Sequence, residues 1–219
     1  MSPPEGSLSP TPASEAASLS VPQAIEARRS IRKYKPAPVP DADLERIFAL
    51  TGHAPSSANT QPWRFVFVRD PALKSALRAA SYNQAQVDAA PVAIVAYSDM
   101  RDTLATLDEV VHPGLQGPPR EQMLTSIRGF LGPKSDADRD AFGTAQTFIA
   151  VGYLSLAAQS LGYATSIMGG FDPAKVKEVL GLPAHAAVAA VIALGVADEE
   201  GYTAHRHPLP RILREATSA

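Results

Sequence analysis

The 219-residue sequence contains no cysteine. Without a thiol the chain can form no disulfide, no zinc–thiolate site and no iron–sulfur cluster, and it has no sulfur nucleophile. Any redox chemistry that the chain performs must therefore be carried by an organic cofactor.

Charge of one sign and long apolar runs are also scarce. Charged residues make up 19% of the chain and the net charge is −2, so we expect neither nucleic acid nor an anionic membrane as a partner. No run reaches the roughly 18 continuous apolar residues of a membrane-spanning helix. The N-terminus has neither the basic start nor the apolar core of a signal peptide, and we expect a cytoplasmic protein.

The common nucleotide-binding and hydrolase signatures are missing as well. The sequence has no G-x-x-x-x-G-K-[ST], no G-x-G-x-x-G after a strand, no G-x-S-x-G and no H-E-x-x-H. Its five histidines are scattered, and the pair His205 and His207 lacks the further ligands that zinc requires. We expect no metal site.

What is present divides into a tail and one domain. Residues 1–20 are rich in Pro, Ser, Ala and Glu, which predicts a disordered tail. Residues 21–219 have the length of one well-buried domain. Within it, a turn-rich stretch followed by a helical pattern predicts a lid-like insertion over about residues 101–134.

The hydrophobic pattern predicts helices and strands in an irregular order. Strands are predicted at residues 64–68, 91–97, 163–168 and 186–197, and the second has the continuous apolar run of a central strand. Helices are predicted at residues 21–30, 81–90, 138–161 and 120–131, the last with Met123, Leu124, Ile127 and Leu131 on one face. Further helices are predicted at residues 41–54 with Asp41 as N-cap, 71–80 starting at Asp70 and Pro71, and 173–182 with Asp172 as N-cap before Pro173. This order disfavours a doubly wound Rossmann unit and predicts an α+β layered domain.

A cationic run, ARRSIRKYK, covers residues 27–35. On a helix, Arg28 and Arg32 would be four residues apart and, with Ser30, could present guanidinium groups and a hydroxyl to one phosphate. The alternative is a solvated helix end whose cations complement the helix dipole.

Two further clusters carry amides, hydroxyls or glycines. The loop before Trp63 contains Pro55, Ser56, Ser57, Asn59 and Gln61, groups that can hydrogen-bond the edge of a planar heteroaromatic ligand or simply form a turn. Later come the amides of Asn83, Gln84 and Gln86, and a strand end with Met168, Gly169 and Gly170, where a ligand could approach the backbone.

Taken together, these stretches resemble the FMN-dependent nitroreductase family. RRSIRKY, APSSANTQPW, YNQAQVDAAPVAIV, IMGGFDP and a terminal RHP occur in the family's order, over about residues 21–214. The resemblance implies a nitroreductase-like layered α+β fold, with a mixed antiparallel central sheet flanked by helices. It also implies an intertwined homodimer with two FMN sites at its interface.

The resemblance assigns roles to the polar clusters. Implied ligands of the FMN phosphate are Arg28, Ser30, Arg32 and Arg206, with Arg211 as a further helper, while Arg29 lines the ribityl or pyrimidine side. Asn83 and Gln86 are implied to contact the ribityl chain and the pyrimidine edge. Many members carry a lysine in place of Gln86, so the group that stabilises the reduced anionic flavin is not assigned here.

Two segments are implied to reach the rest of the flavin. Gly169 and Gly170, which follow Met168, would place a backbone N–H at flavin N5; several relatives carry an acidic residue where Gly169 stands. In the family, the segment with Pro55, Ser56, Ser57 and Asn59 contacts the flavin of the other subunit.

The implied activity is a ping-pong oxidoreductase in which NADH or NADPH reduces FMN, and a nitroaromatic, quinone or similar acceptor then reoxidises it. The GGFDPAKVKEVLGLP stretch is most similar to the quinone- or nitro-reducing branch. One alternative is a specialised flavoenzyme of the same fold, such as a dehalogenase or a flavin-fragmenting enzyme, although no aromatic cluster is assignable in the lid. Another is a non-catalytic flavin carrier.

Overall fold

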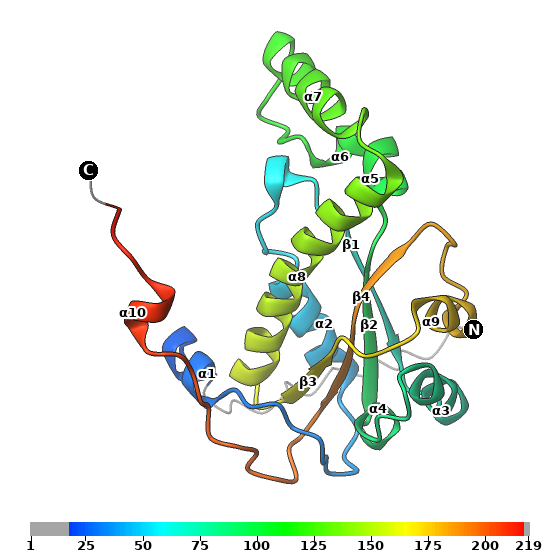
Figure 1. The fold of residues 1–219 in the computed structure, drawn as a ribbon, viewed down its shortest axis with the longest axis vertical. Coiled ribbons are helices and arrows are strands. Elements are labelled where there is room, and N and C mark those ends of the chain that lie inside the picture. Colours follow the sequence, from blue (N-terminus) through cyan, green and yellow to red (C-terminus); the bar gives the residue numbers. More distant parts are fainter. Residues whose placement is uncertain (1–17, 217–219) are drawn as a thin grey trace, which may run out of the picture.

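A four-stranded antiparallel sheet forms the centre of the fold (Figure 1). The computed structural model describes residues 18–216. The strands lie in the order β1-β2-β4-β3 and comprise β1 (Trp63–Val68), β2 (Val92–Ser98), β3 (Ala164–Met168) and β4 (Ala187–Gly195). All four predicted strands are confirmed, and the continuous apolar run of β2 is central, as expected for a strand buried on both faces.

Helices cover both faces of the sheet, which makes three layers. Alternate residues of β2 point to opposite faces, because the side-chain period of a strand is two: Ala93 and Val95 lie in one core, and Ile94 lies in the other. The first core is closed by α3 (Pro71–Ala80), α4 (Gln86–Ala89) and α9 (Pro173–Leu180), and the second by α2 (Asp41–Thr51) and α8 (Asp136–Ser160). The predicted α+β layered fold is confirmed.

The helix caps explain where several of these helices begin. Asp70 and Asp172 accept hydrogen bonds from the first turns of α3 and α9, and a proline follows each of them, as the sequence predicts. The predicted cap of α2 is wrong by one residue: Pro40 occupies the cap position, and Asp41 is already helical.

The long helix α8 is the core helix of the second layer. By length and composition alone it could cross a membrane. In the fold it packs against all four strands, and its Leu154 is completely buried. These contacts account for its apolar character without a membrane.

A helical arm projects from the sheet between β2 and α8 (green in Figure 1). It consists of α5 (Met100–Ala105), α6 (Leu107–Val110) and α7 (Pro118–Leu131) and has a small apolar core of its own. Leu124, Ile127 and Leu131 are buried, and Met123, although 38% exposed, lines an apolar cavity together with Ile127 and Leu131. We refer to residues 100–131 as the α5–α7 arm.

The first helix is shorter than predicted. α1 (Val21–Ala27) ends before the cationic run, and Arg28 already has an extended backbone, with φ −58° and ψ 128°. From Ser30 the chain runs beside β3, where Ser30 bridges Thr165. The predicted helical pairing of Arg28 with Arg32 is therefore wrong, because pairing with β3 replaces the helix.

The two ends of the described chain differ in their contacts. Residues 1–17 of the predicted tail lie outside the described residues, but residues 18–20 are part of the fold: the Leu19 amide donates to Ser160 of α8, and Ser20 caps α1. At the other end, exposed residues 202–216, with the short helix α10 (Leu209–Ile212), extend away from the sheet (red in Figure 1).

Candidate functional site

The cationic run and the C-terminal segment meet around one cavity of about 220 Å³. Two short pairings bring them together: the Lys35 amide donates to Val196, and the Asp198 amide donates to Lys33. The cavity is lined by Arg28, Arg29, Ser30, Arg32, Tyr202, Thr203, Ala204, His205 and Arg206. We call this the arginine cavity, and it unites five of the predicted site residues.

Like charges face one another in the arginine cavity. Burial, together with the positive charges of Arg206 and Arg29, lowers the pKa of Arg28. When cationic neighbours lower the pKa of a guanidinium group, an anion placed between the charges relieves their repulsion and stabilises the protonated form. The cavity is therefore suited to a phosphate group.

The arginines of the cavity differ in the hydrogen bonds that they make within the chain. The Arg29 guanidinium donates to the carbonyls of Glu26 (2.5 Å) and Arg28 (2.9 Å). The Glu199 carboxylate accepts the backbone amides of Arg32 (2.6 Å) and Lys33 (3.2 Å), and these bonds fix the backbone of the cationic run. Arg211 lies on α10 and is not among the residues that line the cavity.

The amide cluster and the strand-end glycines also come together. Gln84 donates through Nε2 to the Gly170 carbonyl (2.7 Å), and Gln86 donates to Met168 Sδ (3.2 Å). Asn83 has a left-handed backbone with φ 58°, which asparagine tolerates better than most residues. A Cβ added to Gly169 would meet no atom within 4 Å, so its backbone is open to a ligand.

Strand β3 connects the arginine cavity with this glycine end. The cationic run pairs with Thr165 near the start of β3, and Met168 ends the strand. At about 3.3 Å per residue, the two polar regions are roughly 10 Å apart along the strand. A ligand with an anionic end and a planar hydrogen-bonding end could span both.

The polar loop of residues 55–61 lies at the other end of the sheet. Trp63, just after it, pairs with Ser98 at the far end of β2, and the Ser57 amide donates to Gln146 Oε1 of α8 (2.8 Å). The opposite end of α8, at Ser160, holds the chain that enters α1. At 1.5 Å per residue these two positions on α8 are about 21 Å apart. One chain thus keeps its polar loop away from its own arginine cavity.

The loop is held by contacts to several elements. The Asn59 side-chain amide donates to the Val110 carbonyl at the end of α6 (2.7 Å), and the Gln61 backbone amide donates to Ser56 Oγ (3.0 Å). Within the loop, η1 (Ser57–Asn59) contains non-helical dihedral angles at Ala58.

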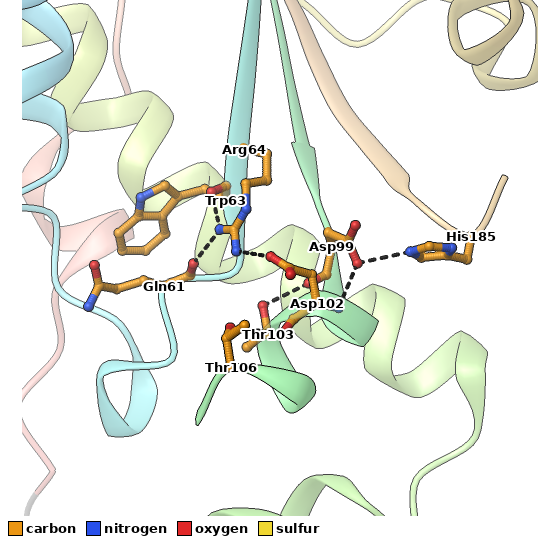
Figure 2. Close-up of polar contacts among 8 residues, drawn as sticks. All are labelled: Gln61, Trp63, Arg64, Asp99, Asp102, Thr103, Thr106 and His185. Atoms are coloured by element: carbon orange, nitrogen blue, oxygen red, sulfur yellow. Dashed lines mark hydrogen bonds and ion pairs between the residues drawn. The ribbon is translucent and has the colours of Figure 1, made fainter. Parts of the chain in front are cut away.

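Sequence reasoning missed a polar network beside this loop, which Figure 2 shows. Arg64 donates to the Gln61 carbonyl (3.0 Å) and forms an ion pair with Asp102, while the Asp99 carboxylate accepts from the Asp102 amide (2.9 Å) and contacts His185 Nε2 (2.9 Å). Burial opposes ionisation of Asp99, but the bonds from Asp102 and His185 outweigh it and lower its pKa. The D-x-x-D spacing of Asp99 and Asp102 signals a helix start, whereas the long-range partners leave no local signal.

An apolar cavity of about 210 Å³ lies between the polar loop and α7. Its lining includes Met123, Phe130 and Phe142, together with Ser57, Ala58, Thr60, Ser126, Ile127 and Leu131. The rings of Phe130 and Phe142 meet edge to face with centroids 5.9 Å apart. No aromatic cluster was assignable in the lid from the sequence, and an aromatic pair forms at its border because Phe142 on α8 supplies the second ring.

Among residues 18–216, no three His, Asp or Glu side chains gather in a way that could hold a metal ion. His205 is one of the residues that line the arginine cavity.

Two oxidoreductases are similar to this chain in sequence over most of its length. The chain is 48% identical over 186 residues to a protein named NADH dehydrogenase from Thermus thermophilus, which covers 85% of this chain and 91% of that one. It is 32% identical over 171 residues to an oxygen-insensitive NADPH nitroreductase from Helicobacter acinonychis, covering 76% and 81% of the two chains.

Solved structures share the fold. A protein from Exiguobacterium sibiricum, determined in complex with FMN, superposes with a TM-score of 0.81 at 25% identity, over 90% of this chain and 98% of that one. The profile of the nitroreductase family matches residues 25–196, which include the cationic run, the polar loop and the strand-end glycines. The chain is an oxidoreductase and belongs to the nitroreductase family.

Proposed function

We propose that this chain is an FMN-dependent NAD(P)H oxidoreductase that reduces nitroaromatic, quinone or similar acceptors. The observation that carries the proposal is the arginine cavity, which β3 connects to the open backbone of Gly169, roughly 13 Å from Thr165 along the chain. The structure of the Exiguobacterium relative in complex with FMN supports the choice of cofactor.

The arginine cavity would hold the FMN phosphate. Arg28, Arg32 and Arg206 would supply charge-assisted hydrogen bonds and Ser30 a hydroxyl. A phosphate dianion would relieve the repulsion that lowers the pKa of Arg28. Arg29 already donates to two carbonyls, so we assign it a position beside the ribityl chain or pyrimidine rather than a primary phosphate contact.

The glycine end of β3 would hold the isoalloxazine. Asn83 and Gln86 would bind the ribityl chain and the pyrimidine edge, and the backbone of Gly169 and Gly170 would present an N–H at flavin N5. Gln86 is only 8% exposed, and its contact with Met168 orients its amide. No cation is assigned to the N1 side, in contrast to members with lysine at the position of Gln86.

When bound, FMN would supply the hydride acceptor that allows NAD(P)H oxidation and acceptor reduction to follow one another at the same face, as a ping-pong cycle. The chain's own residues bind, orient and tune the cofactor, and we assign no side chain as a catalytic acid or base. The names of the Thermus and Helicobacter relatives support NADH or NADPH as the donor. The apolar cavity with Phe130 and Phe142 suits an aromatic acceptor.

We propose further that the enzyme is a homodimer in which the polar loop of each copy serves the flavin of the other. Separation of the loop from its own arginine cavity supports this arrangement. So does an apolar groove of about 490 Å³ lined by Leu19, Val21, Ala24, Leu50, His53, Tyr153, Leu156, Ala157 and Ser160. The exposed C-terminal segment, with Leu209, Ile212 and Leu213 all more than 60% exposed, offers apolar side chains that a second copy could cover.

The proposed function is tested with the purified protein and added FMN. We expect a bound flavin spectrum, its bleaching by NADH or NADPH under anaerobic conditions, and turnover with nitrofurazone or menadione. Absence of FMN binding at excess FMN would refute the cofactor assignment.

The later steps separate the alternatives. Bound FMN that neither nicotinamide bleaches would indicate a flavin carrier. Bleaching without turnover of either acceptor would indicate a specialised flavoenzyme, such as a dehalogenase or a flavin-fragmenting enzyme. A monomer that binds FMN tightly would contradict the assignment of Pro55, Ser56, Ser57 and Asn59 to the second copy's site.

A further inference from the structure

The polar loop has a strained backbone. Ala58, Asn59 and Gln61 have positive φ values of 51°, 56° and 43°, a region that non-glycine residues rarely adopt. Such conformations persist only where the surrounding structure holds them in place. The groups that hold this loop therefore determine whether its ligand-facing shape exists before a ligand binds.

Three of these groups come from separate elements. Gln146 on α8 accepts the Ser57 amide, the Val110 carbonyl on α6 accepts the Asn59 side chain, and the Asp99 amide donates to the Pro62 carbonyl (3.0 Å). Each contact fixes one point of the loop. None of the three binds the chain on both sides of Pro62, that is, at both Gln61 and Trp63.

Arg64 makes hydrogen bonds on both sides of Pro62. Its Nη1 donates to the carbonyls of Gln61 (3.0 Å) and Trp63 (2.8 Å), and its Nη2 forms the ion pair with Asp102 on α5. The planar guanidinium group can do this because its donors have a fixed geometry. Figure 2 shows the Gln61 carbonyl facing Arg64 while the side-chain amide of Gln61 points away from it.

The same contacts join the loop to the base of the α5–α7 arm. Asp102 lies in the first turn of α5, and Asp99, which caps that helix, also contacts His185 in the segment before β4. The Arg64 and Asp102 side chains are 36% and 46% exposed, so their ion pair alone contributes little. The two carbonyl contacts hold the Arg64 guanidinium group against the chain at the end of the polar loop.

We propose that Arg64 is a positioning residue: its guanidinium group holds the polar loop in its ligand-binding conformation and couples the loop to the α5–α7 arm. This role deepens the proposed function, because the ligand in question is the flavin of the second copy. Arg64 itself is not assigned a contact with that flavin.

A matched pair of variants tests the role. Arg64→Met removes the donors and keeps an unbranched side chain of similar length. Arg69→Met is the control, because Arg69 also donates to a carbonyl, that of Val39 (2.7 Å), and pairs with a carboxylate, that of Asp41, at a similar side-chain exposure of 38%. Arg69 follows the opposite end of β1, away from the loop.

The first measurement is amide hydrogen exchange in the FMN-free protein. Within the loop, the amides that donate hydrogen bonds belong to Ser57, Asn59, Thr60 and Gln61. We expect Arg64→Met to accelerate their exchange about tenfold or more, with no such change in Arg69→Met. Unchanged exchange in Arg64→Met, or equal acceleration in both variants, would overturn the proposal.

The second measurement is FMN affinity. Loss of preorganisation should weaken FMN binding by Arg64→Met about fivefold to tenfold, whereas Arg69→Met should bind like the wild type. If the wild type binds no FMN, the proposed function fails, but the exchange result still decides whether Arg64 holds the loop. If the wild type binds FMN and both variants bind it equally well, the positioning role fails alone.

A second variant keeps the test decisive should Arg64→Met not fold. Asp102→Asn leaves the two carbonyl contacts of Arg64 in place and removes only the charge on α5. We expect faster exchange at the base of the α5–α7 arm with a smaller change in the loop. Exchange unchanged in both segments would contradict the coupling.

Discussion

The arginine cavity and the polar loop are both polar, but they store free energy in different forms. In the arginine cavity, burial and the cationic neighbours Arg206 and Arg29 lower the pKa of Arg28, so the unfavourable term is electrostatic. In the polar loop, residues such as Ala58 have positive φ, so the unfavourable term is conformational.

The difference shows which region depends on a ligand. Repulsion among the arginines is relieved by an anion that the chain does not supply, so this region should change most when its ligand binds. Strain in the polar loop is opposed by bonds that the chain itself makes through Gln146, Val110 and Arg64. The loop should therefore be nearly complete before the ligand arrives.

The largest expected effect lies in the arginine cavity. In Arg28→Ala and Arg206→Ala, we expect each lost charge-assisted hydrogen bond to cost about 1.5–3 kcal/mol, which weakens FMN binding roughly tenfold to a hundredfold per variant. Riboflavin, which lacks the phosphate, should bind both variants as it binds the wild type. Flavin titrations followed by fluorescence give both affinities.

Arg46→Ala, at an exposed position on α2, is the control for that experiment and should bind FMN normally. An equal loss of riboflavin and FMN affinity in the cavity variants would show that these arginines do not act on the phosphate.

A smaller effect is expected from the strain in the polar loop. Ala58→Gly removes a Cβ from a left-handed position, and we expect the free energy of unfolding to rise by about 1 kcal/mol. Ala76→Gly, at an exposed helical position of α3, should lower it by about 1 kcal/mol. Denaturant unfolding of both variants measures the difference, and a decrease in Ala58→Gly would refute strain at this position.

The smallest expected effect is on the free energy of unfolding at low pH. Because the pKa of Asp99 in the fold lies below its ordinary value of 3.8, its carboxylate stabilises the protein above about pH 4, and this contribution is lost as the pH falls through the lowered pKa. The Asp99→Asn variant keeps an N-cap for α5 but loses the charge.

Unfolding by urea at about pH 5 and pH 3 checks this expectation. The loss of stability between the two pH values should be smaller in Asp99→Asn than in the wild type. Asp140→Asn, which changes a carboxylate in the cavity that His185 also lines, is the control. Identical losses in the wild type and Asp99→Asn would show that Asp99 does not carry the acid sensitivity.

Sequence reasoning succeeded where a local pattern dictates the structure. The apolar run of β2 predicted a central strand, and Asp172 followed by Pro173 predicted the start of α9, because burial on both faces and helix capping each leave a short-range pattern. The family match rests on the same kind of local stretch.

It failed where a distant segment decides. The residues around Arg28 have good helix propensity, but pairing of Ser30 with Thr165 competes with the helix, and nothing near Ser30 in the sequence signals that partner. The ion pair between Arg64 and Asp102 and the contact between Asp99 and His185 were missed for the same reason, because 38 and 86 residues separate the partners. The roles assigned to individual flavin-site residues remain predictions.

The long helix α8 lies between the polar loop and the chain that enters α1, the helix before the cationic run. It meets the polar loop at Gln146 and the chain entering α1 at Ser160, so its rise fixes a spacing of about 21 Å between these two contact points. If the loop of one copy completes the cavity of the other, the same helix contributes to the distance between the two parts of the site that each copy supplies. Inserting one residue into α8 between these points would rotate one half-site against the other by about 100°, which makes the length of this helix a property of the active site as much as of the core.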